Sequence, residues 1–169
     1  MMSVRSLFEF VNDLPSSVAI RESDLGYAIL LGTHVVSLCL FAGLIIMMDL
    51  RLAGMGNLQT PISQIQKRLF PWQMVGFFVN AVTGLALIYA QPLRYYGKVF
   101  IWVKFSLMLL AGLNAIVFHL TTYRSVAQWD NDVVPPFKAR LAGYFSLALW
   151  VGVIVFGRLT AYPWLTTQY

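Results

Sequence analysis

The only two histidines of the chain, His34 and His119, both lie inside long apolar segments. An ionisable side chain inside a bilayer is costly unless it is paired or bound, so each histidine is a functional candidate. Neutral imidazole is a common axial ligand of haem iron. We therefore expect at least one of the two to bind the iron of a b-type haem held among membrane helices. A hydrogen bond that fixes helix packing and a proton relay are the competing interpretations.

Three further features fit a haem. Lys104 and Arg158 lie at the ends of apolar segments, where they can either extend to the membrane surface or neutralise the haem propionates. Small residues precede His119 by one and two helical turns and leave room for a flat ring: Ala111, Gly112 and Ala115.

The depths of the two histidines bear on whether they share one iron. His34 lies near the centre of its apolar segment and His119 lies several residues past the centre of its own. At about 1.5 Å per residue, parallel helices would offset them by roughly 12 to 16 Å. Axial ligands of one iron lie at nearly the same depth. One shared iron, made possible by helix tilt, and two separate sites both stay open.

The composition excludes a soluble protein. Hydrophobic residues make up 59% of the 169 residues and charged residues only 11%, against about 25% charged residues in soluble domains. The mean hydropathy is +0.69. The net charge of +5 comes without a Lys/Arg run, so we do not expect nucleic-acid binding. The single cysteine, Cys39, excludes an intrachain disulfide and a CxxC site.

Four charge-poor apolar segments are long enough to cross a bilayer as helices. We place them at residues 25–50, 70–91, 98–124 and 137–161. The predicted fold class is an all-α integral membrane four-helix bundle, with a transmembrane domain over residues 25–169. Residues 1–24 mix apolar and charged side chains and predict an amphipathic segment at the membrane interface. Residues 62–69 predict a second, separate segment of this kind.

Polar residues inside the spans have expected structural roles. The mid-span amides Asn80 and Asn114 are expected to form hydrogen bonds between helices. Asp49 and Arg51, at a helix end, are expected to form a boundary ion pair with each other or with Arg124. A stripe at four-residue steps indicates close helix packing: Gly76, Asn80 and Gly84.

Basic residues in the connections predict the orientation. The connections after the first and third spans hold six basic residues, against three after the second span. Cytoplasmic loops carry an excess of Lys and Arg, so we expect both termini to be periplasmic. The six are Arg51, Lys67, Arg68, Arg124, Lys138 and Arg140, and the three are Arg94, Lys98 and Lys104.

Several short motifs resemble a family of small bacterial inner-membrane proteins classed as a domain of unknown function, over nearly the whole chain. The resemblance implies the bacterial inner membrane but brings no established activity. The motifs are Arg21-Glu22-Ser23, Gly32-Thr33-His34, Asp49-Leu50-Arg51, Phe70-Pro71-Trp72, Phe118-His119 and Gly157-Arg158-Leu159.

A weaker resemblance rests on His34 early in the first span and Lys104 at the start of the third. This pattern is similar to the four-helix protoporphyrinogen oxidase family of bacteria, and CopD-type copper-resistance membrane proteins are built similarly. In the oxidase family the early histidine binds b-type haem and the lysine is needed for activity. The resemblance implies a haem-binding bundle with His34 and Lys104 at its site.

Two function classes follow. The first is a b-type haem protein that moves electrons between a quinone or a membrane or periplasmic redox protein and another acceptor. The second is a non-catalytic membrane subunit or scaffold of a larger complex. A copper or ion transporter is disfavoured because no path of Met, Cys and His crosses the spans. No dinucleotide-binding, Walker, HExxH or nucleophile-elbow motif is present.

Overall fold

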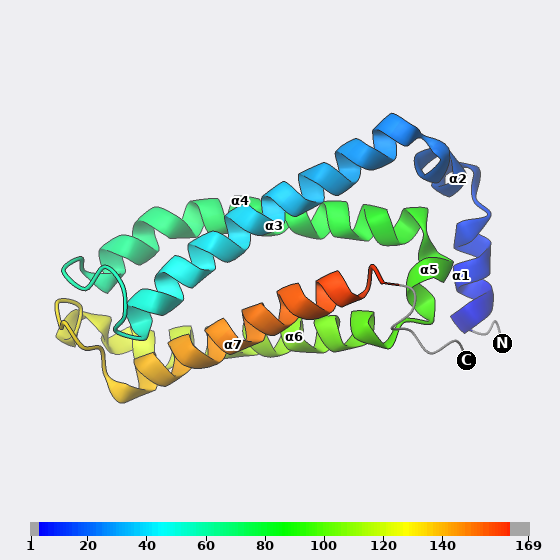
Figure 1. Ribbon diagram of the computed structural model, residues 1–169. Helices are drawn as coiled ribbons and strands as arrows, with labels where there is room; N and C mark the ends of the chain where they lie inside the picture. The colour runs from blue at the N-terminus through cyan, green and yellow to red at the C-terminus, as the bar shows by residue number, and fades with distance from the viewer. Residues whose placement is uncertain (1–3, 163–169) are drawn as a thin grey trace.

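The computed structural model describes residues 4–162 and is built from helices (Figure 1). It is 83% helical, and the described part contains no strand. Four helices are long and apolar enough to cross a membrane: α3 (Asp24–Leu52), α4 (Ile62–Ala90), α6 (Val99–Leu120) and α7 (Phe137–Leu159). The predicted all-α four-helix membrane bundle is confirmed. Residues 163–169, which end the predicted transmembrane domain, lie outside the described residues.

Three short helices gather at one end of the bundle: α1 (Val4–Asn12), α2 (Pro15–Glu22) and α5 (Pro92–Tyr96) (Figure 1). The Phe8 ring of α1 contacts the Tyr96 ring of α5, with centroids 4.9 Å apart. The buried Ser17 of α2 donates a hydrogen bond to the carbonyl of Tyr89, at 2.8 Å. The N-terminal helices are thus tied to the end of α4. Their position at a membrane interface stays a prediction.

The separate segment predicted at residues 62–69 is wrong, because α4 begins at Ile62 and continues through Pro71 without interruption. The residue before the helix, Pro61, provides no side-chain cap. Asp130 supplies the cap instead: its carboxylate accepts a hydrogen bond from the Ser63 backbone N–H at 2.7 Å. Its negative charge also complements the positive end of the helix dipole. The start of α4 is therefore fixed by a residue far away in the chain.

The third span is shorter than predicted at its far end. We placed it over residues 98–124, whereas α6 ends at Leu120. The chain then forms a 3₁₀ helix, η1 (Thr122–Gln128). The other three spans end within three residues of the predicted positions.

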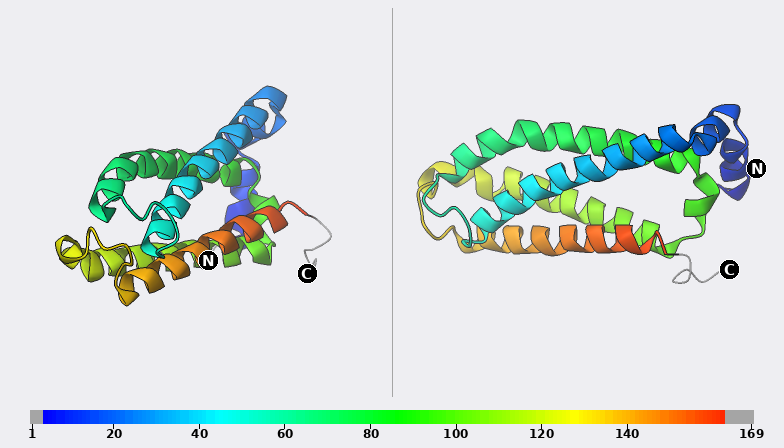
Figure 2. Two further views of the ribbon diagram at one scale, coloured as in Figure 1. Left: turned by 60° about the vertical axis from the view of Figure 1, so that its left-hand side comes forward. Right: turned by 45° about the horizontal axis from the view of Figure 1, so that its top comes forward.

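The spanning helices pack as two pairs, α3 along α4 and α6 along α7, and α3 also packs on α7 (Figure 2). Small residues allow these approaches. A Cβ atom added at Gly76 of α4 would lie 3.0 Å from the Phe41 Cβ of α3, and one added at Gly143 of α7 would lie 2.9 Å from the Asp49 carbonyl oxygen. By contrast, α4 and α6 make little direct contact. This leaves space for a cavity between them.

The predicted boundary ion pair of Asp49 with Arg51 or Arg124 does not form in the described part of the chain. The Arg51 side chain is fully buried and donates hydrogen bonds to two backbone carbonyls, Thr60 at 3.1 Å and Asp132 at 3.0 Å. Residues two apart on a helix point about 200° apart, so Asp49 and Arg51 face different sides. Arg51 thus ties together the loops after α3 and after η1, and Asp49 has no ion-pair partner among residues 4–162.

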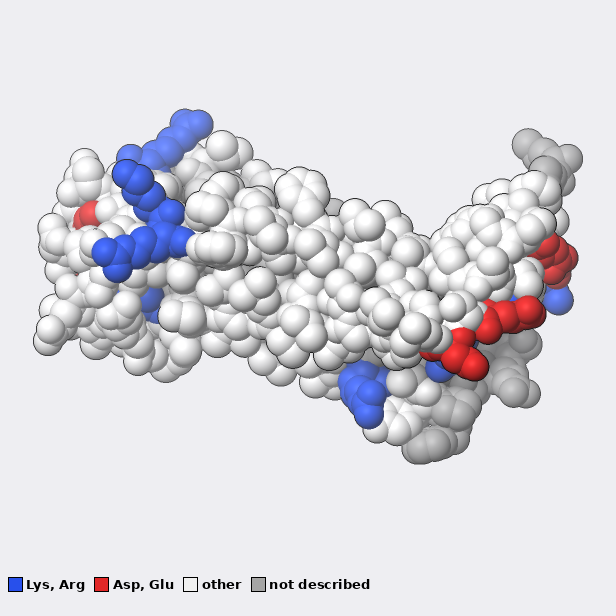
Figure 3. Space-filling view, turned by 90° about the horizontal axis from the view of Figure 1, so that it is seen from above, with Lys and Arg blue, Asp and Glu red and all other residues white. Residues whose placement is uncertain are grey.

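Charge is unevenly distributed along the molecule. Figure 3 shows Lys and Arg gathered at one end of the visible face and Asp and Glu at the other. The basic end carries the exposed side chains of Lys67, Arg68, Arg124 and Lys138. That this end faces the cytoplasm and the termini face the periplasm stays a prediction.

Candidate functional site

His34 lies in α3 and is held against α4 in a defined tautomer. Its Nδ1 lies 3.0 Å from the Thr83 hydroxyl oxygen, and that hydroxyl donates its proton to the Val79 carbonyl at 2.7 Å. With its proton donated there, the hydroxyl oxygen accepts from His34, and this contact is shorter than the 3.4 Å between Nδ1 and the Asn80 side-chain nitrogen, so we assign the imidazole proton to Nδ1. The lone pair therefore lies on Nε2. No residue in the described part hydrogen-bonds to that atom, and Nε2 is left able to bind a metal.

The α4 surface beside His34 is shaped around the imidazole. A Cβ atom added at Gly84 would lie only 3.0 Å from the His34 Cε1 atom, so a larger residue there would displace the ring. Asn80 donates a hydrogen bond to the His34 carbonyl at 2.9 Å. The predicted interhelical role of Asn80 is confirmed, and the stripe of Gly76, Asn80 and Gly84 packs on α3 as predicted. The same stripe positions the candidate ligand.

Lys104 of α6 lies close enough to His34 for the two side chains to interact electrostatically. Its alkyl chain runs past Gly157 of α7, with the Cδ atom 3.5 Å from where a Cβ would be. Among the described residues no carboxylate pairs with its ammonium group. The structure thus brings together the two residues of the weaker family resemblance, one from each helix pair.

Arg158, near the end of α7, follows Gly157 but is exposed. Its guanidinium lies 5.6 Å from the centroid of the Tyr162 ring, in a cation–π contact. It remains at the same end of the bundle as Lys104, where both can meet an anionic group.

His119 lies in the other half of the bundle. Its Nδ1 donates to the Ala115 carbonyl at 2.8 Å, and its Nε2 lies 3.4 Å from the Gln66 side-chain nitrogen. The α4 partners of the two histidines, Gln66 and Thr83, are 17 residues apart, which is about 25 Å along a helix. In this arrangement the two histidines lie too far apart to bind a single iron; separate sites and one histidine without a ligand stay open.

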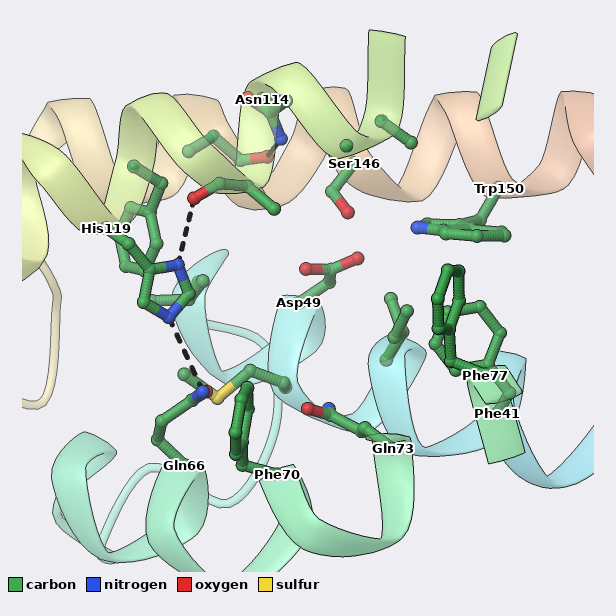
Figure 4. A pocket seen from close by; sticks show the side chains of 18 of the residues that line it. Phe41, Asp49, Gln66, Phe70, Gln73, Phe77, Asn114, His119, Ser146 and Trp150 are labelled. Carbon is green, nitrogen blue, oxygen red and sulfur yellow. Dashed lines mark hydrogen bonds between the residues drawn. The ribbon is translucent and has the colours of Figure 1, made fainter. Parts of the chain in front are cut away.

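His119 borders a cavity of about 320 Å³ between the four spanning helices (Figure 4). This volume is near the lower end of the range for small-molecule sites, roughly 300 to 1,000 Å³. The predicted small-residue face forms one wall, since Ala111, Gly112 and Ala115 all line the cavity. The remaining walls are aromatic, Met and a few polar side chains. The polar ones are Asp49, Gln66, Gln73, Asn114 and Ser146.

The polar side of this cavity was not anticipated from the sequence. Asp49 is only 5% exposed and points into the cavity (Figure 4). Gln66 belongs to residues 62–69, which were predicted to form a separate interfacial segment, and Gln73 belongs to the second predicted span. Asn114 donates to the Ala142 carbonyl at 3.0 Å, which confirms its predicted interhelical hydrogen bond. Gln66 and Gln73 are two helical turns apart on α4, and this spacing could have predicted that they lie on the same face of the helix.

Tyr123 and Lys98 are among the groups outside the spans that have shifted pKa values. Burial, and then the charge of Asp130, raises the pKa of Tyr123, whose ring centroid lies 5.2 Å from that of His119. Tyr123 therefore stays a neutral phenol at physiological pH. At the opposite end, burial and then Arg94 lower the pKa of Lys98, which donates a hydrogen bond to the Thr160 carbonyl.

The described residues contain no group of three or more His, Cys, Asp and Glu side chains that could hold a metal ion by themselves. A metal at His34 or His119 would therefore need a cofactor that brings its own ligands. Haem does so, because its ring supplies four of the iron ligands and the protein needs to add only axial ones.

Comparison with known proteins identifies the chain at family level. Residues 23–163 match the model of DUF6644, a family of unknown function. No curated protein and no solved structure matched the chain. The predicted membership of a domain-of-unknown-function family is confirmed, whereas the comparisons give no support to the haem-binding families.

Proposed function

We propose that this chain, which belongs to the DUF6644 family of unknown function, is a membrane b-type haem protein that takes part in electron transfer. The observation that carries the proposal is that His34 and Lys104, one in each helix pair, lie within range of an electrostatic interaction. A quinone or a partner redox protein would be the electron donor or acceptor.

The His34 side chain fits the role of an axial ligand. Ligating histidines usually donate their second ring N–H to a neighbouring acceptor, which fixes the ring and the tautomer. Thr83 is such an acceptor, because its own proton is used on the Val79 carbonyl. Gly84 leaves the imidazole in place with its Nε2 lone pair available.

Lys104 fits the role of a counter-ion. An ammonium group in a spanning helix is costly without a partner, and the described residues offer no carboxylate to it. Two propionates on a haem held at His34 would supply the missing negative charge. Arg158, at the same end of the bundle, would supply a second cation nearer the surface. Bound haem would provide one-electron chemistry, which the protein tunes through the axial ligand and its hydrogen bonds.

The visible absorption spectrum of the purified full-length protein, produced with haem supplied, tests this proposal. We expect a b-type haem spectrum that is lost or shifted in His34→Ala. The matched control is His119→Ala, which removes the other intramembrane histidine about 25 Å away along α4 and should leave the spectrum unchanged. Lys104→Met should retain the axial ligand but weaken haem retention.

A variant of Thr83 tests whether this residue positions the His34 ring, as distinct from a role in folding. Thr83→Val keeps the side-chain shape but removes the acceptor for the His34 N–H, so we expect a shifted haem reduction potential with haem still bound. A wild-type protein without haem, or a His34→Ala variant with an unchanged spectrum, would contradict the proposal. The first result would favour a non-catalytic subunit or scaffold.

A further inference from the structure

The carboxyl group of Asp49 is the least satisfied polar group in the cavity of Figure 4. Its Oδ2 atom is buried and has no hydrogen-bond partner among the described residues. The guanidinium of Arg51 donates to the Thr60 and Asp132 carbonyls and forms no ion pair with Asp49 in the described part of the chain. The Ser146 side chain forms a hydrogen bond with the carboxyl group, which leaves Oδ2 as the oxygen without a partner. A buried carboxyl oxygen without a partner is costly, so its retention at the wall of a cavity points to a ligand.

The other polar groups of the cavity present acceptors to its interior. The side-chain nitrogen of Gln73 donates to the Leu44 carbonyl at 3.2 Å, and that of Asn114 donates to the Ala142 carbonyl. Since a carbonyl oxygen only accepts, these contacts identify the bonded atoms as the amide nitrogens and leave the amide oxygens available. By the same argument, the His119 proton lies on Nδ1, so its Nε2 accepts from the Gln66 side-chain nitrogen at 3.4 Å and the Gln66 amide oxygen is left as an acceptor. Such a lining favours a ligand that donates hydrogen bonds.

Aromatic rings form the opposite part of the cavity wall. The Phe41 ring lies 5.6 Å from that of Phe77 and 5.0 Å from that of Trp150, the second pair being edge to face. All three side chains line the cavity. Aromatic faces attract cations, most strongly where water is excluded. The same rings offer a large apolar surface for the rest of a ligand.

The cavity is reached from the side of the bundle. Its lining includes side chains that are exposed on α4, Phe78 at 62% and Phe70 at 46%. Across from them on α6, a Cβ added at Gly112 would meet no atom within 4 Å. Because α4 and α6 make little contact, a molecule dissolved in the bilayer can enter between them.

We propose that this cavity binds an organic ammonium ion with an apolar body, its charge paired with Asp49 and its body against the aromatic wall. The site lies in the other half of the bundle from His34 and does not rest on the haem proposal.

The test compares two ligands of nearly the same shape, 4-phenylbutylammonium and the uncharged 4-phenylbutanol, by equilibrium dialysis against the full-length protein in detergent. We expect the ammonium ion to bind about tenfold more tightly than the alcohol, the equivalent of 1.4 kcal/mol. Asp49→Asn should remove that preference and leave alcohol binding within about twofold. His34→Ala should bind both ligands as the wild type does, which separates this proposal from the haem proposal.

Two further variants keep the result interpretable. Asp132→Asn removes an exposed carboxylate at the same end of the bundle and should have no effect. If Asp49→Asn does not fold, Phe77→Leu tests the aromatic wall and should weaken the binding of both ligands, because both place the same apolar body there. Equal affinity of the wild type for both ligands, no binding of the ammonium ion, or ammonium binding unaffected by Asp49→Asn would each overturn the proposal.

Discussion

Arg51 offers a sharp test of how the basic end of the bundle is held together. Its side chain is fully buried and bridges the Thr60 and Asp132 carbonyls. Hydrogen bonds from a charged donor contribute roughly 1.5 to 3 kcal/mol each. Arg51→Met preserves most of the side-chain length but removes both bonds and leaves two carbonyls without their donor. Two such bonds at the lower end of that range amount to about 3 kcal/mol. We therefore expect the free energy of unfolding to fall by about 3 kcal/mol.

The measurement is an unfolding titration in mixed micelles with increasing SDS, followed by circular dichroism. Arg51→Lys keeps the charge but has a single ammonium group in place of the planar guanidinium. It should therefore lose only about half as much stability as Arg51→Met. The control is Arg68→Met, which removes an exposed cation at the same end. Limited proteolysis should also cut the loop after α3 faster in Arg51→Met. An unfolding midpoint equal to that of the control, with unchanged proteolysis, would refute the bridging role.

Three other predictions concern the bundle as a whole. Asp130→Ala removes the cap of α4 and should cost about 1 kcal/mol in the same SDS titration, whereas the control Asp132→Ala should not, because Asp132 contacts Arg51 through its backbone. Gly143→Val places a side chain against the Asp49 carbonyl and should lower the free energy of unfolding by roughly 1 to 3 kcal/mol. The control is Gly32→Ala, whose added Cβ meets no neighbouring atom and which should have no such effect. Tags at either terminus should be labelled from the periplasm in intact cells, and labelling only after the inner membrane is broken would show the opposite orientation.

The spanning helices were predictable because the signal is local. A charge-free apolar segment of spanning length has few alternatives to a membrane helix. The start of α4 was missed because its cap comes from Asp130, which is 67 residues after Ser63 in the chain. Local sequence carries no trace of such a partner. Without that partner, the polar residues at the beginning of α4 led to the prediction of a separate amphipathic segment.

The candidate site was predictable only in part. His34, His119 and Lys104 stood out as ionisable residues in apolar segments, and the weaker family resemblance already linked His34 with Lys104. Asp49 was read as a boundary residue, because burial near a helix end depends on which helices pack against it. The cavity itself arises because α4 and α6 make little direct contact. Such a lack of contact between two helices leaves no pattern in the sequence.

The pairing of the helices also has a consequence for how the protein is assembled. Each pair is formed by helices that follow one another along the chain, so each is a helical hairpin whose contacts are all local. Spanning helices can form first and associate afterwards within the bilayer. The first hairpin can thus be complete before the second leaves the insertion machinery, with α5 as a short tether between them. Association of the two hairpins then depends chiefly on contacts between α3 and α7. These contacts can form only after α7, the last spanning helix, has been synthesised.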